Sequence, residues 1–208
     1  EDVVARAHEM LRGAMPSLLT IIAPRHPERG AAISQLLGAR GLSSSRRSDR
    51  DMVSHTTDVY IADTVGELGL FYALSPFSFV GGSIVAHGGQ NPVEAIKLGS
   101  AVLSGPHTFN FAETYTVLER YRGFRLVSEA EDLAATLKAL FHDQAEAAPT
   151  VDSLPPELGT PQAAALDNGY FSQANIASFE SRQIEPYIAT GADSHNQSWQ
   201  ERFGAEPS

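Results

Sequence analysis

Short apolar segments of strand character alternate with amphipathic helical segments along residues 1–143, and this alternation constrains the fold more than any other feature. The apolar segments, such as LLTIIA and DVYIAD, are rich in β-branched residues and are flanked by turn-forming residues. Strands of this kind are typical of parallel sheets whose two faces are both covered by helices. The sequence therefore predicts an α/β fold, a Rossmann-like parallel sheet with helices on both faces.

The expected strands are 18–23, 58–63, 77–82, 101–105 and 124–127, and the expected helices are 2–14, 28–40, 65–74, 91–99, 110–121 and 129–143. The polar stretch SSSRRSDRD, residues 43–51, is expected to be a solvated connection. Thr64 is expected to cap the helix that follows the second strand.

Polar or glycine-rich segments follow the successive strands. Pro24 and Arg25 follow the first strand, and the turn Val65, Gly66 and Glu67 follows the second. The third strand is followed by HGGQNPVEA, residues 87–95. Because ligands of parallel sheets bind at the carboxyl ends of the strands, these segments predict one binding site along that edge.

The residue types suit a nucleotide. Glycines let backbone N–H groups approach a phosphate, and an arginine fork can grip a phosphate or a base. A carboxylate one turn into a helix, such as Glu94, is well placed to accept both hydroxyls of a ribose. No G-x-G-x-x-G and no Walker A motif occurs, and the histidines lack the spacing of a metal site.

Each of these residues also has a purely structural explanation. Asn91 is an ordinary helix cap with Pro92 at the favoured first position, and Glu94 suits the other half of a capping box. Gly88 and Gly89 suit turns with positive φ. We expect a binding site because the polar segments occur together on one edge of the sheet.

The composition excludes several classes of protein and of binding site. The chain carries a net charge of −10, and residues 1–143 hold 13 Lys and Arg against 16 Asp and Glu, so the basic footprint of a nucleic-acid binder is lacking. No apolar run reaches the roughly 18 residues that a membrane-spanning helix needs. There is no cysteine, which excludes disulfides and thiolate metal sites.

Four motifs together resemble a known family. APRHPER, ADTVGELGLFYALSPFSFVGGS, HGGQNPVEA and GPHTFNF resemble, in order and spacing, the C-terminal half of 3-deoxy-D-manno-octulosonic acid (Kdo) transferases. The resemblance covers residues 1–143. It implies a glycosyltransferase of the GT-B type that transfers Kdo from CMP-Kdo to the lipid A precursor, without a metal or other cofactor, at the cytoplasmic face of the bacterial inner membrane.

The resemblance also implies which residues bind the CMP donor. The matching positions are Pro24, Arg25, Val65, Gly66, Glu67, Asn91, Pro92, Val93 and Glu94. It implies that Glu94 holds the ribose, while the turn at Gly66 and Glu67 and the side chain of Arg25 contact the nucleotide.

In this family the catalytic base is a glutamate of the N-terminal domain, which also carries the acceptor site and the membrane anchor. The chain opens with EDVVARAHEML, of mid-helix character, and we expect this domain and the leading strands of the donor domain upstream. From this chain alone we expect donor binding, no catalytic residue, membrane contact only through the other half, and a soluble cytoplasmic fragment. A sheet without its leading strands is expected to expose an edge or a central gap.

The last 65 residues differ from residues 1–143 in composition and in the pattern of expected elements. Residues 144–161 are expected to be a Pro- and Ala-rich acidic linker, and residues 162–208 a separate segment with a strand, helix, strand pattern. The part at about 162–204 resembles a DDE-type insertion-sequence transposase, with Asp167 at the position of one catalytic aspartate and Asn168 in place of alanine. A capping or turn-forming role for Asp167 is the competing interpretation.

Two alternatives to a transferase donor domain remain open at this point. Sugar-nucleotide epimerases share the expected fold, and residue patterns alone do not distinguish CMP from UDP. A fusion remnant without a ligand, carrying a transposase-derived tail, is the non-enzymatic alternative.

Overall fold

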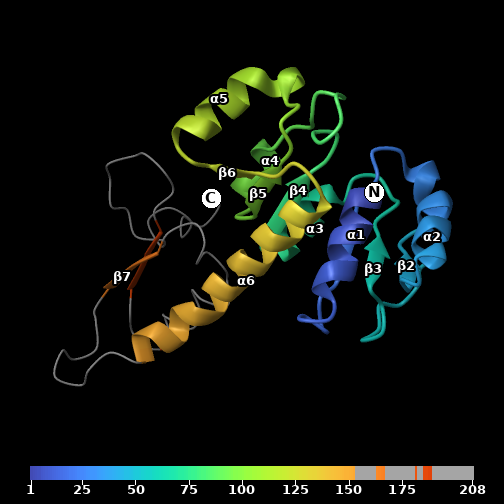
Figure 1. Cartoon of the computed structure of the whole chain (residues 1–208), viewed down its shortest axis with the longest axis horizontal. Coiled ribbons are helices and arrows are strands. Elements are labelled where there is room, and N and C mark those ends of the chain that lie inside the picture. The colour runs from blue at the N-terminus through green and yellow to red at the C-terminus, as the bar shows by residue number, and fades with distance from the viewer. Residues whose placement is uncertain (153–162, 167–180, 182–184, 189–208) are drawn as a thin grey trace, which may run out of the picture.

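The computed structural model describes residues 1–152, 163–166, 181 and 185–188 (Figure 1). Its strands form parallel sheets that alternate with helices along the chain. One three-stranded sheet has the order β1-β3-β2, a second has the order β4-β5-β6, and β7 pairs with β8. The predicted α/β class with parallel strands is confirmed.

The strands are β1 (Thr20–Ile22), β2 (Ser44–Arg46), β3 (Val59–Ile61), β4 (Phe77–Val80), β5 (Ala101–Ser104), β6 (Phe124–Leu126), β7 (Ala163–Leu166) and β8 (Glu185–Ile188). The α-helices are α1 (Asp2–Leu11), α2 (Gly30–Ala39), α3 (Leu68–Leu74), α4 (Val93–Lys97), α5 (Ala112–Arg120) and α6 (Ala130–Asp152). Two 3₁₀ turns, Pro27–Arg29 and Phe109–Phe111, precede α2 and α5.

In the first sheet, successive residues of β3 face opposite sides, as the pleat requires. Val59 and Ile61 are fully buried and pack with Ile33 and Leu37 of α2. Tyr60 faces the other side and packs against Phe71 of α3, with their ring centroids 6.1 Å apart. Helices therefore cover both faces of this sheet.

The second sheet is covered in the same way. On one face Leu103 of β5 is buried with Leu133 of α6 and Leu11 of α1. On the other face Val80 and Val102 pack against Ala95 of α4. Both faces of the second sheet are therefore also closed by helices.

Helix α1 connects the two sheets. Its Ala5 belongs to the core of the first sheet, whereas Ala7 and Leu11 belong to the core of the second. No strand pairing joins β1 to β4 in the described part of the chain, so the two sheets meet through side chains rather than through a continuous ladder. An apolar cavity of about 460 Å³, lined by residues 15–19, Pro76 and Phe141, lies at the start of these two strands.

His8 of α1 is buried at the first sheet, with 2% of its surface exposed. Its Nδ1 lies 2.8 Å from Thr20 Oγ1, and its Nε2 lies 3.5 Å from Asp58 Oδ1. Burial lowers the pKa of His8 below its usual value, and the neighbouring Asp58 carboxylate opposes that effect. The ring is therefore a neutral part of the core.

Three predicted details were wrong. Part of the expected connection 43–51 is the strand β2, whose three residues pair with β3; polar residues suit it because it has a partner on one side only. Thr64 does not cap α3, which begins at Leu68; its hydroxyl donates to Glu67 Oε2 at 2.6 Å instead. The last helix of residues 1–143, expected to end near 143, continues to Asp152, so the first part of the expected linker 144–161 is helical.

In the tail, β7 and β8 pair in parallel, with Ala163 opposite Glu185. Asp167 and Asn168 lie outside the described residues, so the predicted aspartate of the transposase-like segment has no structural counterpart here. Among the helices of the described residues, none is both long and apolar enough to cross a membrane.

Candidate functional site

The loops after β1, β2 and β3 meet at Asp63, which follows β3. Asp63 is buried, and its carboxylate accepts hydrogen bonds from Ser48 N–H (2.8 Å), Ser48 Oγ (2.8 Å) and Arg46 Nε (3.0 Å). Gly30, after the β1 loop, packs so closely that a Cβ there would lie 2.1 Å from Asp63 Oδ2. Asp63 therefore fixes three strand ends relative to one another.

The electrostatics of Asp63 match this role. Burial alone would raise the pKa of Asp63, but the hydrogen bonds from Ser48 and the adjacent Arg46 guanidinium bring it below its usual value. Arg46 Nη2 lies 2.9 Å from Asp63 Oδ2. The carboxylate is therefore ionised and fully engaged within the protein, so its function is to organise the edge.

Glu67, in the predicted turn after β3, is held by two neighbours. Its carboxylate pairs with Arg47, through Nε at 3.1 Å and Nη2 at 2.5 Å, and also accepts the Thr64 hydroxyl. Arg47 and then Thr64 lower the pKa of Glu67 to about 2. Gly66 has φ of +91°, a conformation that favours glycine. The turn is thus rigidly tied to the loop that follows β2.

Glu94, in the first turn of α4, contrasts with Glu67. Its side chain is exposed, and no hydrogen bond or ion pair engages it within the described part of the chain. Its Oε1 lies over α3, because a Cβ built on Gly69 would come within 3.1 Å of it. Burial, and secondarily the Glu94 charge, raises the pKa of Tyr72. Glu94 is therefore a free acceptor beside the start of α3.

Asn91 caps the start of α4, as its structural explanation predicted. Asn91 Oδ1 accepts the backbone N–H of Val93 at 3.0 Å, and Pro92 already has helical torsions, φ −84° and ψ −11°. Pro92 is fully buried. The reciprocal hydrogen bond of a capping box, from Glu94 back to Asn91, is lacking among the described residues, which leaves the Glu94 carboxylate free.

Gly88 and Gly89 serve packing within the protein. Both have positive φ, as expected, at 87° and 73°. Asn110, beyond β5, donates from its backbone to Gly88 O (3.0 Å) and from Nδ2 to His87 O (3.0 Å). A Cβ on Gly88 would lie 2.4 Å from that Asn110 side chain. These glycines join the β4–α4 loop to the loop after β5.

The other predicted residues lie on the same edge of the sheet, at the surface of the protein. Val65 is 86% exposed, and Gly66 is exposed beside it. Arg25 is exposed, and no hydrogen bond or ion pair holds it within the described residues, while Pro24 beside it is half-buried. The structure thus brings the turn at 65–67 and Glu94 together at α3, and it leaves Arg25 unattached at the end of β1.

Sequence reasoning missed the loop after β2. Arg46, Arg47 and Ser48 hold Asp63 and Glu67, yet their segment was interpreted as a connection. The sequence signal was the pair Arg46 and Arg47 together with the acidic motif DT-x-x-E at 63–67, but nothing in the spacing of the two showed that they would meet. In the described part of the chain no group of three or more His, Cys, Asp or Glu side chains could hold a metal ion.

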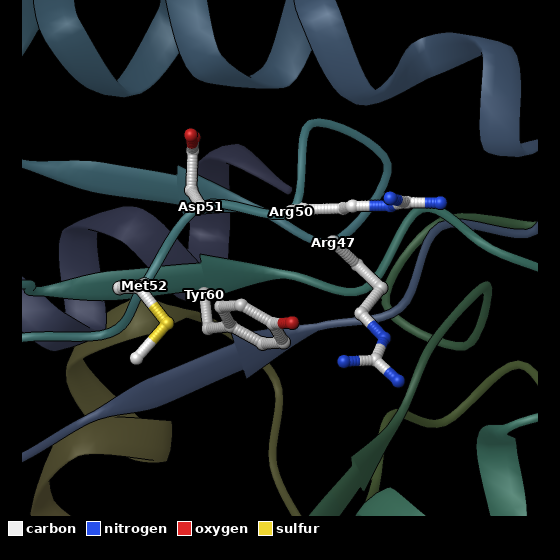
Figure 2. Close-up of a pocket in the computed structure, with 5 residues that line it drawn as sticks. All are labelled: Arg47, Arg50, Asp51, Met52 and Tyr60. Atoms are coloured by element: carbon white, nitrogen blue, oxygen red, sulfur yellow. The ribbon is translucent and has the colours of Figure 1, made fainter.

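A cavity of about 400 Å³ adjoins this loop and is lined by Arg47, Arg50, Asp51, Met52 and Tyr60. In Figure 2 the Tyr60 hydroxyl and the Arg50 guanidinium point toward the right of the view, and the Arg47 side chain runs toward the bottom, with its guanidinium to the right of and below the Tyr60 hydroxyl. The cavity therefore adjoins the edge that carries the predicted residues.

Comparison with solved structures finds a similar domain. The chain matches the crystal structure of the C-terminal CMP-Kdo binding domain of WaaA from Acinetobacter baumannii, with a TM-score of 0.62 and 30% sequence identity, over 69% of this chain and 73% of that one. The chain belongs to the Kdo transferase family. No family model matches it.

Relatives in the Kdo transferase family agree. The chain is 37% identical over 145 residues to the 3-deoxy-D-manno-octulosonic acid transferase of Haemophilus influenzae, a match over 69% of this chain and 34% of the relative. It is 42% identical over 104 residues to that of Bordetella pertussis, over 49% of this chain and 24% of the relative. The chain therefore spans about a third or less of the length of these transferases.

Proposed function

We propose that this chain binds the nucleotide-sugar donor CMP-Kdo and forms the donor side of a Kdo transferase. The observation that carries the proposal is the similarity of fold and sequence to the CMP-Kdo binding domain of WaaA. The free Glu94 carboxylate at the same strand edge supports it, because a ribose needs an acceptor that no protein group already uses.

Within this site, Glu94 accepts the two ribose hydroxyls. The cap formed by Asn91, with the backbone of Pro92 and Val93, fixes the start of the helix that carries Glu94. Arg25 grips the phosphate or the base with a guanidinium that has no competing partner in the described residues. The Val65–Glu67 turn contacts the nucleotide through its backbone, since the Glu67 side chain is bound by Arg47.

Titration calorimetry of the full chain with CMP tests this proposal. Glu94→Gln keeps the size of the side chain but removes the charge of its acceptors. We expect CMP to bind at least about tenfold more weakly, because one charge-assisted hydrogen bond is lost. Glu113→Gln, in the first turn of α5, is a matched control and should bind as the wild type does. Equal affinity of all three proteins, or no CMP binding by a folded sample, would refute the assignment.

The same assay separates CMP from UDP donors. A preference for a UDP-sugar over CMP would favour the epimerase alternative, and binding of neither would favour a remnant without a ligand. Transfer to the lipid A precursor at the inner membrane, as the full family performs it, is proposed only for a longer protein that contains this donor side. The transposase-like origin of residues 162–204 likewise stays a prediction from sequence.

A further inference from the structure

The cavity beside β3 contains cationic groups that the nine candidate residues do not include. Arg47 and Arg50 line it together with Tyr60, Met52 and Asp51 (Figure 2). The Arg47–Glu67 pair forms its border with the turn at 65–67. Through this ion pair the cavity adjoins the turn at 65–67 of the proposed donor site, on the side of β2.

Arg47 retains a donor that can face a ligand. Glu67 engages Nε and Nη2 of its guanidinium and the Tyr60 hydroxyl also hydrogen-bonds it, which leaves part of its five N–H groups uncommitted. Hydrogen bonds to Glu67 and then to Tyr60 raise the pKa of Arg47. The Glu67 pair therefore orients Arg47 without using all of its donors.

Arg50 has no partner and an uncommon backbone conformation. Its φ is 58°, a region that residues with a side chain rarely adopt, and within the described residues its guanidinium makes no ion pair or hydrogen bond. The turn keeps it there, because Arg50 N–H donates to Arg47 O at 3.1 Å and Asp51 N–H donates to Arg46 O at 3.2 Å. A constrained turn thus presents an uncompensated cation.

The acidic groups nearby do not neutralise Arg50. Glu67 is committed to Arg47, and Asp51 accepts the backbone N–H of Arg46 at 3.1 Å through Oδ2. Figure 2 shows the Asp51 carboxylate pointing away from Tyr60 and from the side to which the guanidiniums extend. The cavity lining therefore holds two guanidiniums and one carboxylate, Asp51, whose Oδ2 is bound by the backbone of Arg46.

We propose that this cavity binds an anionic group of the donor, a carboxylate or a phosphate. Arg50 and the N–H groups of Arg47 that Glu67 and Tyr60 do not use supply the cationic donors, and the Tyr60 hydroxyl proton supplies a third hydrogen-bond donor. The inference rests on the proposed donor binding and extends it, because it adds a second contact region on the β2 side of the Glu67 turn. A donor that carries both a nucleotide phosphate and an acidic sugar has two anionic groups that fit this chemistry.

Arg50→Gly and Arg122→Gly form a matched pair for the test. Both arginines have positive φ, at 58° and 53°, and both are exposed, but Arg122 lies in the turn between α5 and β6, away from the cavity. Glycine relieves the backbone in both variants, so neither should unfold. Calorimetry on the full chain uses inorganic phosphate, CMP, cytidine and free Kdo as probes.

We expect Arg50→Gly to weaken binding of at least one anionic probe by about tenfold or more, because the loss of one charge-assisted hydrogen bond reduces affinity by about this factor. Arg122→Gly should leave the affinity for every probe unchanged. Weaker binding of free Kdo alone identifies a carboxylate, and weaker binding of CMP and phosphate, with cytidine unchanged, identifies a phosphate. Identical affinities of Arg50→Gly and the wild type for every probe would overturn the inference.

The same experiment distinguishes failure of the cavity assignment from failure of the donor-site proposal. If the wild type does not bind CMP but binds phosphate or Kdo in an Arg50-dependent way, the cavity assignment stands and the donor assignment fails. If the folded wild type binds none of the probes, both fail.

Discussion

Replacing Gly30 by alanine should disrupt the anchor that joins the first three strand ends. The added Cβ would lie 2.1 Å from Asp63 Oδ2 and 2.8 Å from both Asp63 Cβ and Cγ. Gly30 has helical torsions, so the alanine itself fits the backbone and only the contact is unfavourable. Overpacking of this kind costs about 1–3 kcal/mol. Displacing Asp63 also weakens hydrogen bonds to a charged group, each of which contributes about 1.5–3 kcal/mol.

The helix propensity of alanine offsets part of this cost by about 0.5–1 kcal/mol. We therefore expect Gly30→Ala to lower the free energy of unfolding by about 2–4 kcal/mol. Urea denaturation followed by far-UV circular dichroism measures the change. Gly38→Ala, in the same helix, is the control, because a Cβ there meets nothing within 4 Å. It should stabilise the protein by about 0.5–1 kcal/mol.

A double-mutant cycle separates the contact from other effects of alanine. Asp63→Ala removes Oδ2 and Cγ, two of the three atoms that the new Cβ would approach. The cost of Gly30→Ala should therefore become smaller in an Asp63→Ala background, since contacting residues are non-additive. The reasoning fails if Gly30→Ala is as stable as Gly38→Ala, or if its cost is unchanged when Asp63 is absent.

Further expectations concern pH and single hydrogen bonds. Because the folded pKa of His8 is lowered, the unfolded chain binds more protons below about pH 6.5, so stability should fall from pH 7.5 to 5.5; His8→Gln should reduce this slope in urea titrations, and an unchanged slope would contradict the assignment. Asn91→Ala removes the acceptor of Val93 N–H and should cost about 1 kcal/mol of stability by thermal denaturation. Ser83→Ala leaves the buried N–H of Gly105, now 2.8 Å from Ser83 Oγ, without an acceptor, and should cost about 1–3 kcal/mol; a neutral effect would mean that another group takes its place.

The sequence predicted the strands that carry apolar runs, from the buried β3 and β5 to the edge strand β6, whose Arg125 and Leu126 are exposed. β3 and β5 are rows of buried residues, and their apolar runs have no other reasonable interpretation. β2 escaped prediction because Ser44–Arg46 pairs on one side only and carries side chains that satisfy Asp63 rather than fill a core. The hydrophobic pattern reports burial, and an edge strand built for polar contacts leaves no such pattern.

The start of α3 shows a second limit. Thr64 was expected to cap a helix that begins at residue 65. In the structure the hydroxyl of Thr64 and the guanidinium of Arg47 both bind Glu67, and the helix begins only at Leu68. Arg47 is 20 residues from Glu67 in sequence, and local spacing cannot report a competitor that tertiary folding supplies.

The contrast between Glu67 and Glu94 follows from the same argument. Both are glutamates at the third position of a predicted helix, and the sequence analysis predicted that both contact the ligand. The Glu67 carboxylate is held by Arg47 and Thr64, whereas Glu94 has no protein partner in the described residues and lies beside Gly69, where there is no side chain to cover it. A carboxylate already bound by protein donors has little to offer a ribose, because exchanging one hydrogen bond for another contributes little net free energy. Of the two, Glu94 is therefore the acceptor that a ligand can use, and Glu67 contributes by holding Arg47 at the cavity beyond the turn.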